Sequence, residues 1–401
     1  MSRPEAPAPL SRRGPRPLLL HLLLAMLKSS ASITALPNWS SVWPGWNPPA
    51  PPPGGANDAE AFARAVFVET MRQDRALLAG IAAYRRHPWQ RDLPEPPVIW
   101  QEGATRLLDY GGTGLTLLFV PSLINRGYIL DLDEDASLLR FLAAAGFRPL
   151  LLDWGWPGER ERRFTLTDYI AGRLDRALTF VCNAPRSAGV VLAGYCMGGL
   201  LTLAAALRHA ERLKGLALLA TPWDFHAADP AGAAQLARLL PQFEPALAFQ
   251  ESLPIDALQT LFALIDPFGV AEKYRAFARL APDSPAARRF VALEDWLNDG
   301  VPLAAPVARE CLAGWYGANT PARGAWLVAG LPVVPEALSL PCFIAAPSRD
   351  RLVPPASAQP LATMIPGARL HIPKAGHIGM VAGRNAATAL WQPLRDWLTA
   401  L

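Results

Sequence analysis

The sequence predicts an α/β fold: a mostly parallel sheet with helices on both faces and a helical cap inserted into it. Between residues 111 and 222, short apolar runs alternate with helical patterns, which is typical of parallel strands joined by right-handed crossovers. The runs are apolar throughout, as expected for strands that are buried on both faces. The alternation stops over 223–340, which is mostly helical, and resumes over 341–401. We therefore expect two halves of one core on either side of the cap.

The expected elements follow this pattern in chain order. A helical stripe over 59–86 and lead-in strands up to residue 110 precede the core. The expected core strands are 116–120, 148–154, 189–195, 213–222, 341–347 and 368–373. The expected core helices are 137–146, which ends at a glycine cap, 166–181, 198–212 and 386–401.

Residues 1–58 precede this pattern and contain an apolar segment and a Pro-rich linker. The segment 18–27 is apolar except for His21, and four arginines lie before it. Its length is below the roughly 20 residues that a membrane span needs. A secretory signal, a helix packed on the body and a helix on an apolar surface all fit the pattern, although His21 and Lys28 weaken the signal interpretation.

The linker at 37–58 is dense in proline and glycine, which predicts an extended, poorly helical segment. Its tryptophans at positions 39, 43 and 46 offer side chains that can dock onto the body.

The composition excludes several classes of protein. With 51% hydrophobic and 18% charged residues, the 401-residue chain has enough apolar side chains for a large core and is not disordered. The net charge of +4 is spread thinly, so nucleic acid is not an expected partner. The cysteines at 182, 196, 311 and 342 form no CxxC pair, which argues against a zinc knuckle or a dithiol site. A reducing, cytoplasmic compartment is the simplest expectation.

The motif "GYCMGG" follows a predicted strand and precedes a predicted helix, the context of a nucleophile elbow. Its centre is Cys196. The glycines two before and two after it are expected where strand and helix crowd together, because a Cβ would clash there. The backbone N–H of Met197 can donate to an oxyanion, and the helix N-terminus favours a thiolate. A buried structural cysteine in a tight turn is the alternative.

Two further residues follow in the order nucleophile, acid, base, which is typical of the α/β-hydrolase fold. Asp350 lies after the strand at 341–347, and His377 lies in the Gly-rich loop after the next strand. We expect Asp350 to orient one ring nitrogen of His377 and the other nitrogen to take the thiol proton. A second oxyanion donor is expected from the loop after the first core strand, at the backbone N–H of Ser122 or Leu123.

Other candidates fit this constellation less well. Asp153 ends a strand and is a rival acid, but it precedes the nucleophile in the chain. His226 follows a strand end and is a candidate for lining the site. The remaining histidines lie in a predicted helix, before a proline or inside an apolar strand.

The chain resembles the polyhydroxyalkanoate synthase family, α/β-hydrolase-fold acyltransferases that polymerise 3-hydroxyacyl-CoA. The similar segments are "GYCMGG", "VPSLINRGYILDL", "DWGWPGERERRFTLTDYIAGRLDRAL", "LEDWLNDGVPLA" with "WYGAN", "DRLVPP" and "GHIGMVAG". The resemblance implies Cys196 as nucleophile, Asp350 as acid and His377 as base. The chain has no counterpart to the long N-terminal domain of the single-subunit synthases, and its size is closer to the short catalytic subunit.

The resemblance also implies the molecules that the chain meets. These are 3-hydroxyacyl-CoA, the growing polyester chain, a second synthase subunit, a second copy in a homodimer and the surface of polymer granules. No cofactor is expected besides the CoA thioester substrate, and no residue pattern indicates a metal. A thioesterase, an esterase or a polymer depolymerase would use the same three residues with water as acceptor. A non-catalytic protein held at a granule or membrane surface is a third interpretation.

Overall fold

The structure is a computed structural model that describes residues 12–34, 55–184 and 189–401. Its contacts divide the chain into two units. The helical unit comprises Met1–Gln90 and Gln259–Asn298, and the sheet unit comprises Arg91–Leu258 and Asp299–Leu401. Residues 37–54 of the predicted linker, with its three tryptophans, lie outside the described residues.

The sheet unit is built on an eight-stranded sheet of order β1-β2-β6-β3-β7-β8-β13-β14. Strand β2 runs antiparallel to β1 and β6, whereas all pairs from β6 to β14 are parallel. The strands are β1 (Val98–Glu102), β2 (Thr105–Asp109), β3 (Thr116–Val120), β6 (Arg148–Asp153), β7 (Val190–Tyr195), β8 (Gly215–Leu219), β13 (Cys342–Ala345) and β14 (Arg369–His371). The predicted fold class is confirmed.

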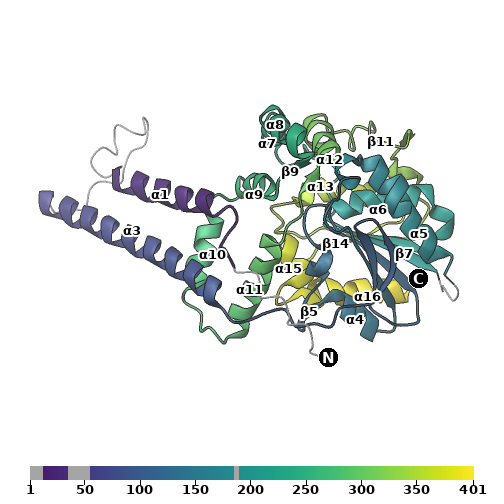
Figure 1. The fold of residues 1–401 in the computed structure, drawn as a ribbon, viewed down its shortest axis with the longest axis horizontal. Helices are drawn as coiled ribbons and strands as arrows, with labels where there is room; N and C mark the ends of the chain where they lie inside the picture. The colour runs from purple at the N-terminus through teal and green to yellow at the C-terminus, as the bar shows by residue number, and fades with distance from the viewer. Residues whose placement is uncertain (1–11, 35–54, 185–188) are drawn as a thin grey trace, which may run out of the picture. The chain divides into compact units, whose positions relative to one another are not determined.

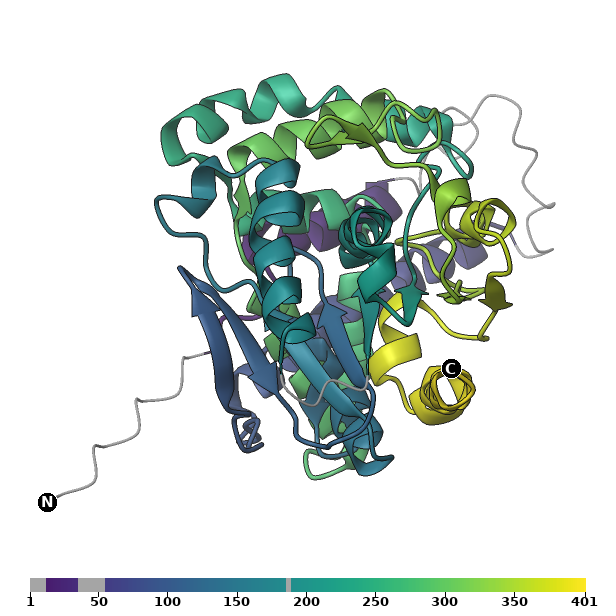
Figure 2. The ribbon, with the colours of Figure 1, turned by 90° about the vertical axis from the view of Figure 1, so that its right-hand side faces the viewer.

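Helices cover both faces of this sheet, which explains why its central strands are apolar throughout. Every residue of β3, β7 and β8 is buried. Helices α5 and α6 lie on one face, and α4 and α16 lie on the other (Figures 1 and 2). The bounds are α4 (Leu138–Ala144), the π-helical turn η3 (Asp168–Leu174), α5 (Asp175–Cys182), α6 (Met197–Arg208), α15 (His377–Ala382), the π-helical turn η7 (Ala387–Trp391) and α16 (Gln392–Thr399).

Local signals set both ends of α4, and the glycine at its C-terminal end is the one that the sequence predicts. The Ser137 hydroxyl caps the N-terminus by accepting a hydrogen bond from the Arg140 N–H at 3.0 Å. Gly146 follows the last turn with φ of +93°, a conformation that glycine adopts without steric cost. The chain can therefore reverse directly into β6.

The region between β8 and β13 is mostly helical, as expected for a cap, and also contains short strands. Its elements in the sheet unit are α7 (Pro230–Ala237), α8 (Leu240–Gln250), β9 (Ser252–Leu253), β10 (Leu303–Ala304), α12 (Ala305–Arg309), the π-helical turn η5 (Glu310–Gly317), β11 (Leu327–Val328) and β12 (Leu331–Pro332). Strand β9 pairs antiparallel with β10, and helix α9 (Ile255–Ala263) contains the boundary between the units.

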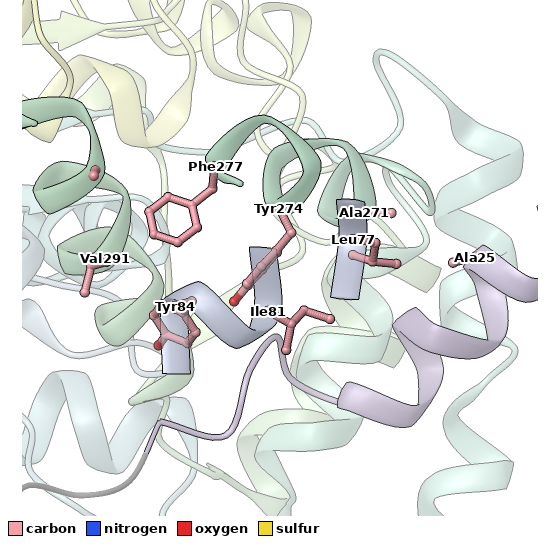
Figure 3. Packing of buried hydrophobic residues seen from close by; sticks show 9 residues of the cluster. Ala25, Leu77, Ile81, Tyr84, Ala271, Tyr274, Phe277 and Val291 are labelled. Carbon is pink, nitrogen blue, oxygen red and sulfur yellow. The ribbon is translucent and has the colours of Figure 1, made fainter. Parts of the chain in front are cut away.

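The helical unit packs α1 (Leu18–Thr34), α3 (Gly55–Arg86), α10 (Gly269–Phe277) and α11 (Pro285–Asn298) around an apolar cluster (Figure 3). Aromatic rings fill its centre: Tyr84 meets Tyr274 edge-on with ring centroids 5.8 Å apart. Gly80 lets α3 approach α10 closely, because a Cβ there would clash with the Tyr274 carbonyl group. At the edge of the cluster, the Tyr84 hydroxyl donates a hydrogen bond to Asp295 at 2.8 Å.

Helix α1 has apolar side chains on two faces. Ala25 lies in the cluster, and Leu18 and Leu22 pack against it. The opposite face is exposed, with Leu19 at 80% of its maximal accessibility and Leu23, Met26 and Leu27 also exposed. The apolar run is thus a helix packed within its own unit, one of the predicted alternatives. None of the helices in the described part of the chain is long and apolar enough to cross a membrane.

Candidate active site

Cys196 occupies the turn between β7, which ends at Tyr195, and α6, which begins at Met197. Its backbone has φ of +57° and ψ of −128°, a conformation that is strained for a residue with a side chain. The neighbouring strand holds it there, because the Cys196 N–H donates to the Leu219 carbonyl at 2.8 Å. Cys196 is partly exposed and lies at the N-terminus of α6. The geometry is that of the predicted elbow.

Two glycines of the motif are required by close packing, as predicted. A Cβ on Gly194 would clash with Thr202 and Gly199 of the following helix. A Cβ on Gly198 would clash with the carbonyl groups of Val120 and Pro121 at the end of β3. The absence of these Cβ atoms lets α6 begin directly above the sheet, beside the loop after β3.

Asp350 lies in the loop after β13, and its side chain is completely buried. Its Oδ1 accepts hydrogen bonds from the backbone N–H groups of Leu352 at 2.9 Å and Val353 at 2.8 Å. Its Oδ2 is 2.7 Å from Nδ1 of His377. The carboxylate is therefore fixed by backbone donors on one oxygen and directed at the imidazole with the other.

His377 is the first residue of α15, and only 7% of its surface is exposed. Because Nδ1 donates to Asp350, Nε2 is the ring nitrogen left to act on a neighbour, and the Cys196 side chain lies close enough to the imidazole to raise its pKa. The structure thus brings together all three residues that the sequence predicts as nucleophile, acid and base.

Backbone hydrogen bonds tie the loop of Asp350 to the loop of His377. The N–H of Ser348 donates to the Pro373 carbonyl at 2.9 Å, and the N–H of Arg349 donates to the Ala375 carbonyl at 3.0 Å. These bonds continue the parallel pairing of β13 with β14 beyond the strands. The distance between the two side chains is therefore set by main-chain structure.

The surroundings of His377 change its protonation. Burial by itself lowers the pKa of the imidazole, but its interactions with Cys196 and Asp350 outweigh this effect. Together they raise the pKa of His377 from 6.5 to about 10. The site therefore favours an imidazolium at position 377, beside the cysteine sulfur.

The residues predicted to supply the oxyanion donors lie on neighbouring segments of the chain. Met197 is the first residue of α6, and among the described residues none pairs with its backbone N–H. The Ser122 hydroxyl is 4.0 Å from the Met197 sulfur, so the loop of Ser122 and Leu123 lies at the start of this helix. Both Ser122 and Leu123 are buried.

A segment of the cap region holds this loop in place. The N–H of Val301 donates to the Ile124 carbonyl at 2.7 Å, and Asn125 forms an antiparallel bridge with Gly300. The position of the loop that follows β3 therefore depends on residues more than a hundred positions later in the chain.

The rival acid Asp153 lies in an ion-pair network away from His377. It pairs with Arg106 at 2.6 Å and with Arg126 at 3.8 Å. Its carboxylate stabilises the join between β2 and β6, because Arg106 and Asp153 face each other in the strand pairing.

The candidate His226 forms a hydrogen bond with the backbone of the cap region. Its Nε2 donates to the Tyr316 carbonyl at 2.7 Å, and Phe225 stacks on Trp315 with ring centroids 5.6 Å apart. His226 thereby fixes the segment that contains Tyr316.

The other histidines have structural partners. His371 bonds the Ala389 carbonyl at 2.6 Å, His87 bonds the Pro282 carbonyl at 2.9 Å, and His209 bonds Asp175. His21 bonds the Arg16 carbonyl at 3.3 Å, and burial lowers its pKa.

Two tyrosines at the site were missed in the sequence. Tyr195 contacts His377 through its ring and its hydroxyl group. Tyr316, in η5, lies close enough to the thiol that the charge of Cys196 adds to the effect of burial in raising its pKa. The available signals were the position of Tyr195 beside the nucleophile and the location of Tyr316 in the family-like segment "WYGAN".

Residues 116–383 match the model of a protein family described as alpha/beta hydrolase fold. The range includes Cys196, Asp350 and His377. Among solved structures, a bromoperoxidase from Bacillus anthracis aligns with a TM-score of 0.49 and 15% identity, covering 74% of this chain and 95% of that chain.

Among curated proteins, the chain is similar to subunits named poly(3-hydroxyalkanoate) polymerase subunit PhaC. The Haloferax mediterranei subunit is 29% identical over 311 residues, which cover 75% of this chain and 63% of the relative. The Allochromatium vinosum subunit is 28% identical over 286 residues, which cover 70% of this chain and 80% of the relative. The match thus spans less than two thirds of the Haloferax protein. These similarities confirm the resemblance found in the motifs.

Proposed function

Because the chain belongs to the α/β-hydrolase family, we propose that it is an acyltransferase that polymerises 3-hydroxyacyl-CoA into polyhydroxyalkanoate through a thioester on Cys196. One observation supports this most directly: a cysteine, in place of a serine, occupies the strained turn beside the paired His377 and Asp350. The similarity to polymerase subunits supports the same substrate class.

The first step is acylation of the thiol. His377 takes the proton of Cys196, and the sulfur attacks the thioester carbonyl of the acyl-CoA. The backbone N–H of Met197, with that of Ser122 or Leu123, stabilises the oxyanion. The C–S bond to CoA then breaks, and the CoA sulfur takes the proton from His377. One thioester replaces another, so the acyl group keeps its activation.

The second step transfers the acyl group to a hydroxyl group. The 3-hydroxyl oxygen attacks the acyl-Cys196 carbonyl while His377 accepts the hydroxyl proton. An ester bond forms, the C–S bond to Cys196 breaks, and the proton returns to the thiol. Asp350 holds the imidazole in the orientation that both steps need. No metal or prosthetic group enters this scheme; the CoA thioester supplies the activated acyl group.

The proposal extends to partners and location. The names of the polymerase subunits support a second subunit as partner, and we propose a homodimer as a further assembly. The exposed leucines of α1 support contact with a hydrophobic surface such as that of a polymer granule, with the protein itself in the cytoplasm.

Hydrolysis is the second candidate function, because water can replace the 3-hydroxyl group in the second step. The partial exposure of Cys196 favours access of water to an acyl group on its sulfur. Such a thioesterase, esterase or depolymerase would use Cys196, His377 and Asp350 in the same roles.

The test supplies 3-hydroxybutyryl-CoA to the purified protein and measures free CoA, free hydroxyacid and polymer together. Polymerisation predicts CoA release with polymer, and Cys196→Ala removes both. Cys182→Ala is the matched control, since Cys182 is also partly exposed but lies at the end of α5. Hydroxyacid without polymer would establish the hydrolase instead. Failure to release CoA, with wild type equal to Cys196→Ala, would favour a non-catalytic surface protein.

A further inference from the structure

Tyr195 is the last residue of β7 and directly precedes the nucleophile position. Its side chain is 4% exposed and faces His377. The tyrosine ring and the imidazole have centroids 5.1 Å apart with an interplanar angle of 32°, so the two rings pack against each other at a tilt. The Tyr195 hydroxyl group also donates a hydrogen bond to the backbone carbonyl of His377 at 3.3 Å. One side chain thus contacts both the ring and the main chain of His377.

These contacts restrain a rotation of the His377 imidazole that its hydrogen bond to Asp350 leaves free. Asp350 holds the ring at a single atom, Nδ1, and a single hydrogen bond permits rotation of the imidazole about it. The Tyr195 ring, packed beside the imidazole, opposes that rotation, and its hydroxyl group holds the His377 backbone where α15 begins.

The main chain of Tyr195 is itself fixed, because it pairs with Leu219 in the parallel ladder between β7 and β8. The strand that places the nucleophile therefore also places the base. The environment also suits a hydrogen-bond donor: burial, together with the charges of Cys196 and Asp350, raises the pKa of Tyr195 well above its ordinary value. The phenol stays neutral and keeps its proton.

We propose that Tyr195 is a positioning residue that aligns His377 between Asp350 and Cys196, by ring contact and by its hydrogen bond to the His377 carbonyl. This role rests on the proposed function in so far as His377 is the base of acyl transfer. Nothing in the chemistry requires Tyr195 to touch the substrate. Its contribution is to keep Nε2 directed at the sulfur through both steps.

Two variants separate the two contacts. Tyr195→Phe keeps the ring and removes the hydroxyl group, and we expect kcat for CoA release to fall about two- to tenfold. Tyr195→Leu removes both contacts, and we expect a loss of roughly 100-fold in kcat. KM should change less than kcat, because the lost alignment concerns the reacting groups. Tyr110→Phe is the matched control: it loses a hydroxyl group that donates to Asp131 at 3.2 Å, away from His377.

A second readout does not depend on turnover. The pKa of His377, followed by NMR of ¹⁵N-labelled histidine and assigned with His377→Gln, should fall in Tyr195→Leu from about 10 towards its ordinary value. Misalignment weakens the interactions with Asp350 and Cys196 that raise it. Tyr110→Phe should leave it unchanged.

These experiments test the role of Tyr195 separately from the proposed acyltransferase activity. If wild type releases no CoA, the acyltransferase proposal fails, while the NMR comparison still tests the role of Tyr195. If folded Tyr195→Leu keeps the wild-type pKa of His377, Tyr195 is not a positioning residue. If Tyr195→Leu does not fold, Tyr195→Phe decides: unchanged kcat and an unchanged pKa of His377 would overturn the proposal.

Discussion

Nδ1 of His377 lies 2.7 Å from Oδ2 of Asp350, although the two residues are 27 positions apart in the chain. Parallel pairing of Ala345 with His371 brings together the loops that follow the two strands. The side chains of Asp350 and His377, which these loops carry, are both buried. In this setting the carboxylate directly affects the charge of the imidazole.

Replacing Asp350 by asparagine should lower the pKa of His377. The asparagine oxygen can still accept the backbone hydrogen bonds of Leu352 and Val353, so the loop is retained while the negative charge is lost. The pKa of His377 then falls, because burial lowers it and the charge of Asp350 no longer raises it. Histidine NMR titration measures the change. We also expect kcat to fall by about 10⁴-fold, as for other carboxylates that orient a catalytic histidine. An unchanged titration would contradict the assignment of Asp350 as the orienting acid.

The same pair predicts a pH dependence of stability. The pKa of His377 is raised from 6.5 to about 10, so its charged form stabilises the folded state fully below pH 6.5 and loses this effect as the pH rises through 10. The difference in free energy of unfolding between wild type and Asp350→Asn should therefore shrink between these pH values. Urea unfolding at several pH values measures it. Asp396→Asn, at an exposed site, is the control, and its difference from wild type in unfolding free energy should not change with pH. If the difference between wild type and Asp350→Asn grows with pH, the predicted pH dependence is wrong.

Cys196→Ala should abolish formation of an acyl-enzyme. Removing the nucleophile of a triad lowers kcat by roughly 10⁶-fold, and no thioester can form on alanine. Mass spectrometry after brief exposure to 3-hydroxybutyryl-CoA should find the added acyl group on the peptide that contains Cys196. Cys182→Ala should retain that label. An acyl group found on another residue would exclude Cys196 as the nucleophile.

Gly198→Ala should damage both stability and acylation. The added methyl group would collide with the backbone carbonyl groups of Val120 and Pro121, which cannot rotate away as a flexible side chain can. We expect a loss of about 1–3 kcal/mol in unfolding free energy. The start of α6 would also move away from the loop of Ser122. Gly172→Ala is the control, because only the far end of Arg176 lies near the added carbon. Equal stability of the two variants would contradict the close approach.

Asp131→Asn should destabilise the sheet unit. The buried carboxylate accepts hydrogen bonds from Ser137 at 2.6 Å, Arg140 at 2.7 Å and Arg91 at 2.8 Å. Loss of its charge removes the buried anion that Arg91 and Arg140 share, at an expected cost of about 3 kcal/mol. Asp396→Asn breaks a pair of 2.6 Å that is exposed, and should cost less than about 1 kcal/mol. Chemical denaturation compares the two; similar losses would show that burial does not control the effect.

Several features were predictable because they depend on local constraints. The strand 116–120 was predicted with the bounds of β3, since burial on both faces demands an unbroken apolar run. The elbow was predictable because its positive φ and close packing require a particular spacing of glycines around Cys196. The bounds of α3 were less well predicted: it begins at Gly55, before the expected residue 59, because helix starts have weak signals.

By itself the sequence determined the order of the core strands and helices, the candidate residues Cys196, Asp350 and His377, and the steric need for Gly194 and Gly198. Only the tertiary structure decided which strands are neighbours, that Gln259–Asn298 groups with the N-terminal helices, and that Tyr195 meets His377. The physical reason is that apolar periodicity specifies which face of an element is buried, whereas contacts between residues far apart in the chain depend on how all the elements pack at once.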